Sequence, residues 1–178
     1  VFVYRADRGL DLHSMRDPRL RELTIGVHLI GDDGANPPPA HALGAQGIVD
    51  NVVGYPIYGD YREPNPPARI IDAVVRGEID LAAVWGPLGG YSARRAAVPL
   101  EVAPITDTAD FAPLRFDFAI AMGVRQGEHA FRDQLNAILA RRRADIDRLL
   151  EAYGVPRIAQ AAATAGRAAG LSEAPEAD

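Results

Sequence analysis

The sequence predicts an α/β fold, and three segments support this prediction. Residues 65–91 contain a capped amphipathic helix that passes through a tight turn into a short apolar strand. Residues 23–30 form a second apolar run that is typical of a buried strand. Residues 131–153 repeat Phe, Ile and Leu at helical spacing. Amphipathic helices beside apolar strands are the pattern of helices packed on a sheet.

The chain opens with a predicted strand at residues 1–4, followed by a polar connector at residues 5–18. After the strand at residues 23–30, a loop of small and polar residues reaches position 36. This loop has the composition of a strand-to-helix turn. Residues 37–47 then predict a helix, because three prolines stand near its first turn, where proline is tolerated best.

The helix within residues 65–77 carries signals at both ends. Asn65 can cap its start, and Gly77 can supply the left-handed residue that ends it. Ile70, Ile71, Val74 and Val75 line one face between these ends. The run at residues 81–85 lacks alternating polar residues, which favours a parallel strand covered on both faces.

Two further strands are predicted at residues 100–105 and 116–124, each bounded by Pro or Gly. The long helix at residues 131–153 is stopped by Gly154 and Pro156. Residues 159–178 are rich in Ala and nearly free of large apolar side chains, so we expect a disordered tail there.

The composition limits the classes of function. The 178 residues are close to the size of one ordinary domain, and 48% hydrophobic content is enough for a core. A net charge of -5 disfavours general nucleic-acid binding, which depends on clustered cations. The chain has neither a membrane-spanning run nor an export signal, and it begins in a strand without an initiating Met. We therefore expect that an earlier portion precedes it.

No catalytic or metal-binding motif emerges from the sequence. There is no serine nucleophile elbow, no Walker loop and no G-x-G-x-x-G turn. The absence of Cys removes thiolate nucleophiles and Cys-based metal sites. The four histidines are far apart in the sequence, and His28 lies inside a strand pattern, where a hydrogen-bonded core or sheet residue is expected. We assign neither catalytic residues nor a metal.

The candidate binding residues follow strands. Ligands of open α/β sheets bind beyond the carboxyl ends of the strands. Two loops predicted at such ends and one tyrosine of a possible rim supply the candidate binding residues. They are Asp32, Gly34, Asn36, Tyr58, Trp85, Gly86 and Pro87. Gly86–Pro87 and Gly89–Gly90 predict a loop with little side-chain cover, open to a ligand or partner.

Structural alternatives remain open for several of these residues. Trp85 can simply plug the core, and the tyrosines at positions 55, 58 and 61 can cover the sheet edge with their hydroxyls in water. Asp32 and its neighbour Asp33 can be ordinary turn residues, and their charge would oppose an anionic ligand at the following helix.

Several segments together resemble a known family. The runs VFVYRADRGLD, LTIGVHLIGDDGANPPPAHAL and ARRRADIDRLLEAYGVP, with GIVDNVVGYPIYGDYREPNPPARIIDAVVRGEIDLAAVWGPLGGY, resemble the methanol-dehydrogenase-associated periplasmic binding proteins of the MxaJ/XoxJ type. The resemblance covers about residues 1–158. The run RGEIDLA alone indicates only the broad type II solute-binding fold, whereas IGDDGAN, VDNVVGY and NPPARI with VWGPL indicate this subgroup.

The resemblance implies a type II periplasmic-binding-protein-like α/β fold, in which two lobes form a clamshell. Residues 1–4 would be a crossing strand, residues 5–115 the second lobe, and residues 116–158 a return strand and C-terminal helix belonging with the first lobe. Most of the first lobe would be absent from this chain. The Ala-rich tail would follow from residue 159.

The resemblance also implies a function. It predicts a periplasmic, non-enzymatic accessory protein that engages or activates a pyrroloquinoline-quinone (PQQ) dependent methanol dehydrogenase, with the PQQ and metal held by that partner. One departure from the wider fold is informative, because amino-acid-binding relatives place an Asp where this chain has Trp85. Without that charge an ammonium ligand is disfavoured. The alternative is a solute-binding component of an ABC transporter for a small organic ligand.

Overall fold

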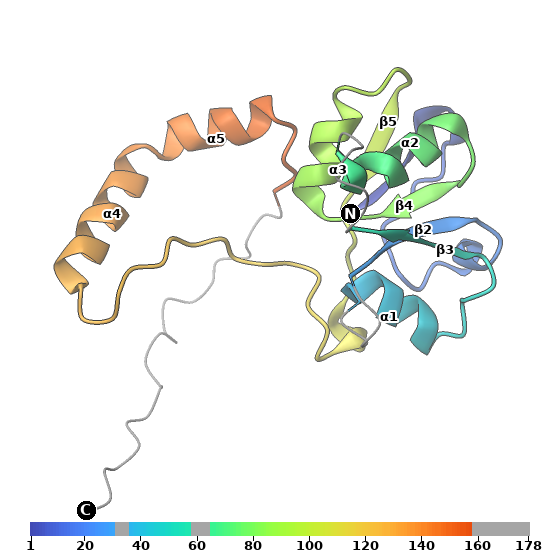
Figure 1. Cartoon of the computed structure of the whole chain (residues 1–178), viewed down its shortest axis with the longest axis horizontal. Helices are drawn as coiled ribbons and strands as arrows, with labels where there is room; N and C mark the ends of the chain where they lie inside the picture. Colours follow the sequence, from blue (N-terminus) through green and yellow to red (C-terminus); the bar gives the residue numbers. More distant parts are fainter. Residues whose placement is uncertain (31–35, 58–64, 158–178) are drawn as a thin grey trace, which may run out of the picture.

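The computed structural model describes residues 1–30, 36–57 and 65–157. Its strands form one sheet in the order β3-β2-β4-β1-β5 (Figure 1). The strands are β1 (Phe2–Arg5), β2 (Ile25–Leu29), β3 (Val52–Pro56), β4 (Leu81–Ala83) and β5 (Leu100–Ala103). Strands were thus predicted correctly at residues 1–4, 23–30, 81–85 and 100–105.

The sheet is mixed rather than wholly parallel. β2 pairs in parallel with β3 and with β4, as the apolar run of β4 predicts. On its other side β4 pairs antiparallel with β1, where Val3 lies opposite Ala82. β1 also pairs antiparallel with β5, so β1 is the reversed strand of the sheet. The prediction of a parallel β4 is therefore correct for one of its two neighbours.

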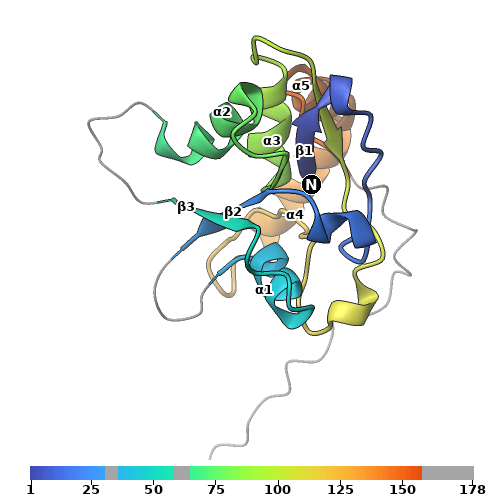
Figure 2. The same cartoon turned by 90° about the vertical axis from the view of Figure 1, so that its right-hand side faces the viewer.

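Both faces of the sheet are buried at the central strands β1, β2 and β4, which explains why β1 and β4 show no polar alternation. One face packs against α1 (Pro38–Ala45) and the long connector after β1, and the other packs against α2 (Arg69–Arg76) and α3 (Gly86–Ala93) (Figure 2). The fully buried side chains of the first face include Phe2, Leu12, Met15, Leu20, Ile25, Leu43 and Leu81. Those of the second face include Val3, Ile70 and Val74.

α2 follows the predicted amphipathic pattern, but its start differs from the prediction. Gly77 ends the helix in the left-handed conformation, with φ of 72°. Asn65, however, precedes a 3-10 turn (η3, Pro66–Ala68), and its side chain makes no capping hydrogen bond. Pro66 and Pro67 carry no N–H, so a side-chain cap has no donor at the first two positions. The Asn65 carbonyl instead accepts from Ala68 N at 2.9 Å.

The predicted loop at residues 86–90 is wrong, because these residues belong to α3. Trp85 is its N-cap residue, and Pro87 stands in the first turn, where the ring suits a helix. A Cβ atom on Gly89 would lie 2.9 Å from Val3 Cγ2, so glycine lets the helix approach the sheet closely. Tertiary packing here outweighs the low helix propensity of glycine.

Polar side chains fix the chain just before β2. Asn51, from the VDNVVGY run, donates from Nδ2 to the carbonyls of Leu20 at 2.7 Å and Leu23 at 2.6 Å. Asp80, from the RGEIDLA run, accepts a hydrogen bond from Thr24 N at 2.8 Å. These two motif residues therefore have structural roles in the sheet lobe, by which we mean the five strands with α1 to α3.

Residues 117–157, here called the C-terminal arm, run out from the sheet lobe and return to it (Figure 1). The predicted strand at residues 116–124 is wrong, because the described chain offers it no neighbouring strand and it has no regular structure. The predicted helix at residues 131–153 is two helices, α4 (His129–Arg141) and α5 (Arg143–Ala152), with a break at Arg142.

The arm is largely exposed. Neither α4 nor α5 contains a buried residue, and Ile120 is 85% exposed. Among the described residues, no helix combines the length and the apolar character needed to cross a membrane. The predicted division into a lobe at residues 5–115 and a return segment at residues 116–158 stays a prediction, and the predicted tail at residues 159–178 lies outside the described residues.

Candidate functional site

The carboxyl ends of three parallel strands meet at one edge of the sheet lobe. His28 lies near the end of β2, Ile57 follows β3, and Trp85 follows β4. All three residues line a cavity of about 680 Å³. The full lining is His28, Ile57, Asn65, Pro67, Trp85, Pro87, Leu88, Tyr91, Leu149, Leu150, Tyr153 and Val155. The cavity therefore occupies the edge where α/β folds place their ligands.

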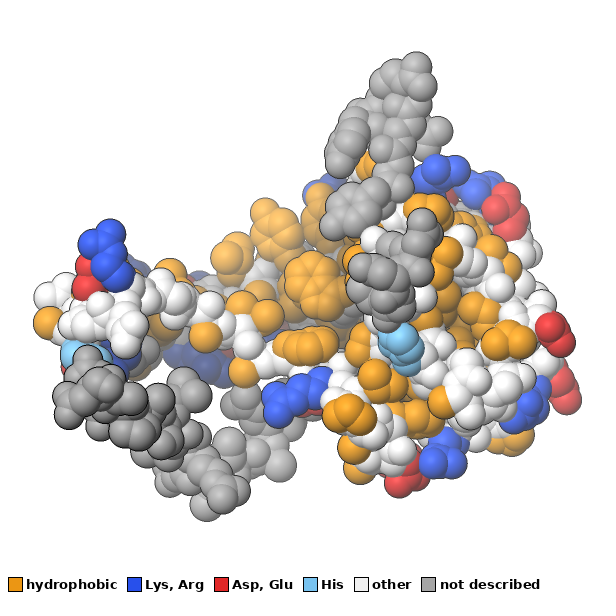
Figure 3. Space-filling model, turned by 60° about the horizontal axis from the view of Figure 1, so that its bottom comes forward, with side chains coloured by type: hydrophobic (Ala, Val, Ile, Leu, Met, Phe, Trp, Pro, Cys, Tyr) orange, Lys and Arg blue, Asp and Glu red, His pale blue; other side chains and the backbone are white. Residues whose placement is uncertain are grey.

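The C-terminal arm closes the opposite wall of this cavity. Tyr153, directly after α5, stacks on Tyr91 of α3 with ring centroids 5.9 Å apart and an angle of 16° between the planes. The backbone of the arm approaches α3 so closely that a Cβ atom on Gly90 would overlap the carbonyl oxygen of Gly154. Figure 3 shows hydrophobic side chains gathered between the sheet lobe and the arm.

Close contact between α3 and the arm depends on small residues on both sides. A Cβ atom on Gly86 would lie 2.9 Å from Pro156 Cγ. Gly154 itself has a positive φ of 69°, a conformation that other residues adopt only with strain. The glycines of the WGPLGGY run thus serve helix packing and the shape of the cavity wall, rather than an open loop.

His28 is the titratable group of the cavity with a perturbed pKa. Its Nε2 lies 3.0 Å from the carbonyl oxygen of Pro67. A carbonyl oxygen only accepts, so Nε2 carries the proton. Burial lowers the pKa of His28 below its ordinary value of 6.5, and the Pro67 contact opposes this shift only in part. The neutral ring therefore keeps Nδ1 as a hydrogen-bond acceptor.

The lining is otherwise almost wholly apolar and aromatic. No Asp, Glu or Arg side chain lines the cavity in the described part of the chain. Trp85 is 60% exposed, which is unusual for a large apolar side chain that only plugs a core. Across the three described ranges, no group of three or more His, Asp or Glu residues is placed to hold a metal ion. The cavity suits an uncharged, apolar occupant.

The predicted site residues are only partly brought together. Trp85 and Pro87 line the cavity, whereas Gly86 lies in the first turn of α3 against Pro156. Asn36 is outside the lining, and its Oδ1 is buried without a hydrogen-bond partner. Asp32, Gly34 and Tyr58 lie outside the described residues. The binding role of all seven residues stays a prediction.

Sequence reasoning missed much of the lining. His28 was predicted as a hydrogen-bonded sheet residue, which is correct, but it also faces the cavity. The position of His28 near the carboxyl end of a parallel strand was the available signal. Leu149, Leu150 and Tyr153 come from an arm more than 60 residues after Trp85, and no local pattern connects the two segments.

No protein-family profile matches the chain. Among curated proteins, it is 29% identical over 167 residues to Protein MoxJ of Methylorubrum extorquens AM1, a match that covers 88% of this chain and 54% of that protein. The chain thus spans about half the length of this curated relative.

Two solved structures share the fold. The periplasmic binding protein XoxJ from Methylobacterium extorquens AM1 matches with a TM-score of 0.73 and 31% identity, over 89% of this chain and 68% of that one. MxaJ from Methlophaga aminisulfidivorans MPT matches with a TM-score of 0.64 and 21% identity, over 87% of this chain and 65% of that one. The second match supports the fold alone.

Proposed function

Because this chain belongs to the XoxJ family of periplasmic binding proteins, we propose that it is an accessory protein whose cavity docks a segment of a PQQ-dependent methanol dehydrogenase. The α/β fold of a partial periplasmic binding protein, predicted from sequence, is confirmed by the structural matches. A periplasmic location for this chain is part of the proposal, since a relative is named as periplasmic.

The apolar lining of the cavity is the observation that supports docking. Trp85, Tyr91 and Tyr153 present large aromatic surfaces at one site. Aromatic side chains dominate the binding energy of protein interfaces when they fill apolar pockets. Among the described residues, no Asp, Glu or Arg lines the cavity, which disfavours an amino-acid cargo, whose ammonium and carboxylate would each lose a charged partner.

We propose that this chain performs no chemistry itself. Within the described ranges, the titratable groups that line the cavity are a buried neutral histidine and tyrosines, and no nucleophile is paired with a base there. General acid–base catalysis needs positioned groups within hydrogen-bond reach of a reacting atom. The PQQ and the metal are therefore expected on the dehydrogenase, and the role of this chain is binding.

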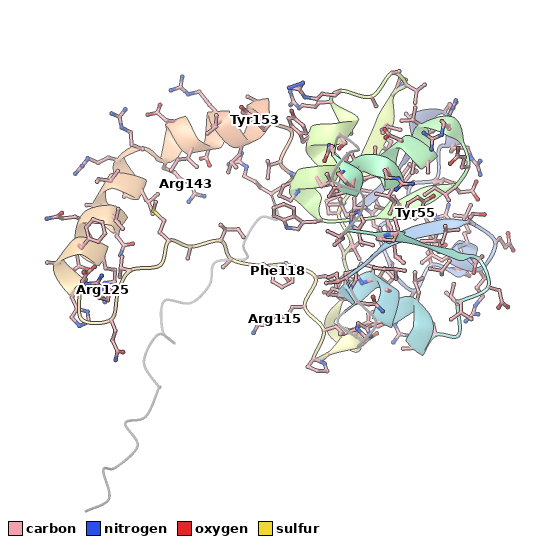
Figure 4. The ribbon with its side chains drawn as sticks, in the orientation of Figure 1. Tyr55, Arg115, Phe118, Arg125, Arg143 and Tyr153 are labelled. Carbon is pink, nitrogen blue, oxygen red and sulfur yellow. The ribbon has the colours of Figure 1, made fainter. Side chains whose placement is uncertain are left out.

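Co-elution with a PQQ-dependent methanol dehydrogenase tests the proposal. Trp85→Ser removes an aromatic wall of the cavity and is expected to weaken the complex about tenfold or more, as for an interface anchor. Phe118→Ser is the matched control, because Phe118 is 61% exposed, close to the 60% of Trp85, yet it lies on the arm outside the cavity lining (Figure 4).

Two results would count against docking. Absence of any complex between the wild-type chain and the dehydrogenase contradicts the proposal. Equal weakening by Trp85→Ser and Phe118→Ser contradicts the assignment of the cavity as the docking surface.

The size of the cavity favours a second candidate, capture of a small organic ligand for a transporter. A volume of about 680 Å³ lies within the range of small-molecule sites. Trp85 is the only Trp of the chain, so its emission reports on the cavity directly. A neutral organic compound that shifts this emission and blocks co-elution of the dehydrogenase would favour ligand capture over docking.

A further inference from the structure

A second hollow adjoins the apolar cavity at the tyrosine stack. It has a volume of about 510 Å³ and is lined by Tyr91, Arg94, Arg95, Ala152 and Tyr153. Tyr91 and Tyr153 line both spaces, so the two are immediate neighbours. The first space is almost wholly apolar, whereas the second carries two guanidinium groups and no acidic lining residue in the described chain.

The guanidinium groups of Arg94 and Arg95 have no carboxylate partner within the described ranges. Several other arginines of the chain pair with a carboxylate at short distances, such as Arg5 with Asp7 at 2.5 Å and Arg76 with Glu78 at 2.6 Å. Arg95 instead lies over the ring of Tyr91, with its Cζ 4.5 Å from the ring centroid. A guanidinium held against an aromatic ring keeps its N–H edge free for a carboxylate.

The charge of these arginines contrasts with that of the whole chain, which is -5. A helix C-terminus favours nearby cations, and Arg94 is the C-cap residue of α3. That effect explains a positive charge at this end of the helix. The helix C-terminus does not explain why both arginines line a hollow that shares Tyr91 and Tyr153 with the apolar cavity.

We propose that the tyrosine–arginine hollow binds the carboxylate of an acidic residue within a docking segment whose apolar residues fill the adjoining cavity. This inference rests on the proposed docking function and defines the chemistry of the partner segment. An extended peptide advances about 3.3 Å per residue, so the acidic residue lies within a few positions of the apolar ones. Arg donates a bidentate pair of hydrogen bonds to a carboxylate, and the tyrosine rings exclude water from one side.

Two matched peptides test this proposal with the whole chain. One peptide has the sequence Leu-Phe-Leu-Gly-Glu-Glu with blocked ends, and the other replaces both Glu residues by Gln. Neither contains Trp, so the emission of Trp85 reports binding of each. At low salt the acidic peptide is expected to bind about tenfold more tightly, as two exposed ion pairs allow.

The variants identify the groups responsible. The double substitution Arg94→Gln with Arg95→Gln is expected to abolish the preference for the acidic peptide and to leave binding of the amide peptide unchanged. Arg115→Gln is the matched control, because Arg115 is an exposed arginine without an ion pair in the described chain, just before the arm and well away from Tyr153 (Figure 4). It is expected to retain the preference.

Three outcomes would overturn the inference. Equal binding of both peptides to the wild-type chain contradicts carboxylate binding in the basic hollow, while the proposed docking of apolar segments stands. Weaker binding of both peptides by the double variant shows that the arginines only support the cavity wall. Binding of neither peptide to the wild-type chain removes the inference together with the docking function on which it rests.

Discussion

Gly90→Ala is expected to separate the C-terminal arm from α3 without unfolding the sheet lobe. The added Cβ atom would overlap the carbonyl oxygen of Gly154 and lie 2.7 Å from its carbonyl carbon. Non-bonded carbons prefer about 3.5 Å, so the carbonyl carbon alone requires residue 154 to move away by about 0.8 Å, and the overlapping oxygen requires more. Both contacting groups are backbone, and α5 buries no residue that would hold it in place.

The retreat is expected to weaken the stack of Tyr91 on Tyr153. Such an aromatic pair contributes about 1 kcal/mol, which corresponds to about fivefold in a binding constant. The neutral fluorophore dansyl amide measures this loss, because energy transfer from Trp85 reports its entry into the cavity. We expect about fivefold weaker dye binding by Gly90→Ala. The urea midpoint is expected to stay unchanged, because both core clusters lie outside the C-terminal arm.

Gly44→Ala is the matched control for this experiment. Gly44 also lies in a helix, α1, but a Cβ atom there meets nothing within 4 Å. It is expected to bind the dye like the wild-type chain and to be more stable by up to about 1 kcal/mol, because alanine favours a helix over glycine. Equal dye binding by both glycine variants, or global unfolding of Gly90→Ala, would refute the proposed contact between the arm and α3.

Three further predictions concern the sheet lobe. Burial lowers the pKa of His28 below 6.5, so the unfolded chain binds more protons than the folded chain at acidic pH. As the pH falls below 6.5, the unfolding free energy of the wild-type chain, measured in urea, should therefore decrease relative to that of His28→Gln, by at most about 1.4 kcal/mol per pH unit. Equal dependence of the two unfolding free energies on pH would contradict this. Ile70→Ala, at a fully buried position, should cost about 2–5 kcal/mol of unfolding free energy, whereas exposed Ile120→Ala should change it by less than about 0.5 kcal/mol. Asn51→Ala removes both hydrogen bonds to the carbonyls before β2 and should lower the urea midpoint by the equivalent of about 1–3 kcal/mol, and an unchanged midpoint would contradict that role.

The elements of the sheet lobe with strong local signals were predictable from the sequence. α2 combines an apolar face with a left-handed Gly77, and β4 is a short apolar run directly after it. In these segments local preference and tertiary packing agree. The position of Trp85 at the carboxyl edge followed from the same reasoning and is where the structure places it.

The remaining features depend on contacts between distant segments. α3 contains three glycines, and its helix forms where Gly89 packs on Val3, which no local propensity reveals. Residues 116–124 alternate in the manner of a strand, but a strand needs a neighbour, and the described chain provides none. The wall formed by Tyr153 depends on the return of the arm to α3, and sequence spacing contains no information on that return.

Fluorine NMR of the chain labelled with 5-fluorotryptophan tests the central claim most directly. Trp85 is the only Trp, so a single fluorine signal reports on the cavity. Addition of a PQQ-dependent methanol dehydrogenase is expected to shift or broaden this signal, and dansyl amide is expected to compete with the change. A signal that stays unchanged while a complex forms by size-exclusion chromatography would contradict docking at the cavity.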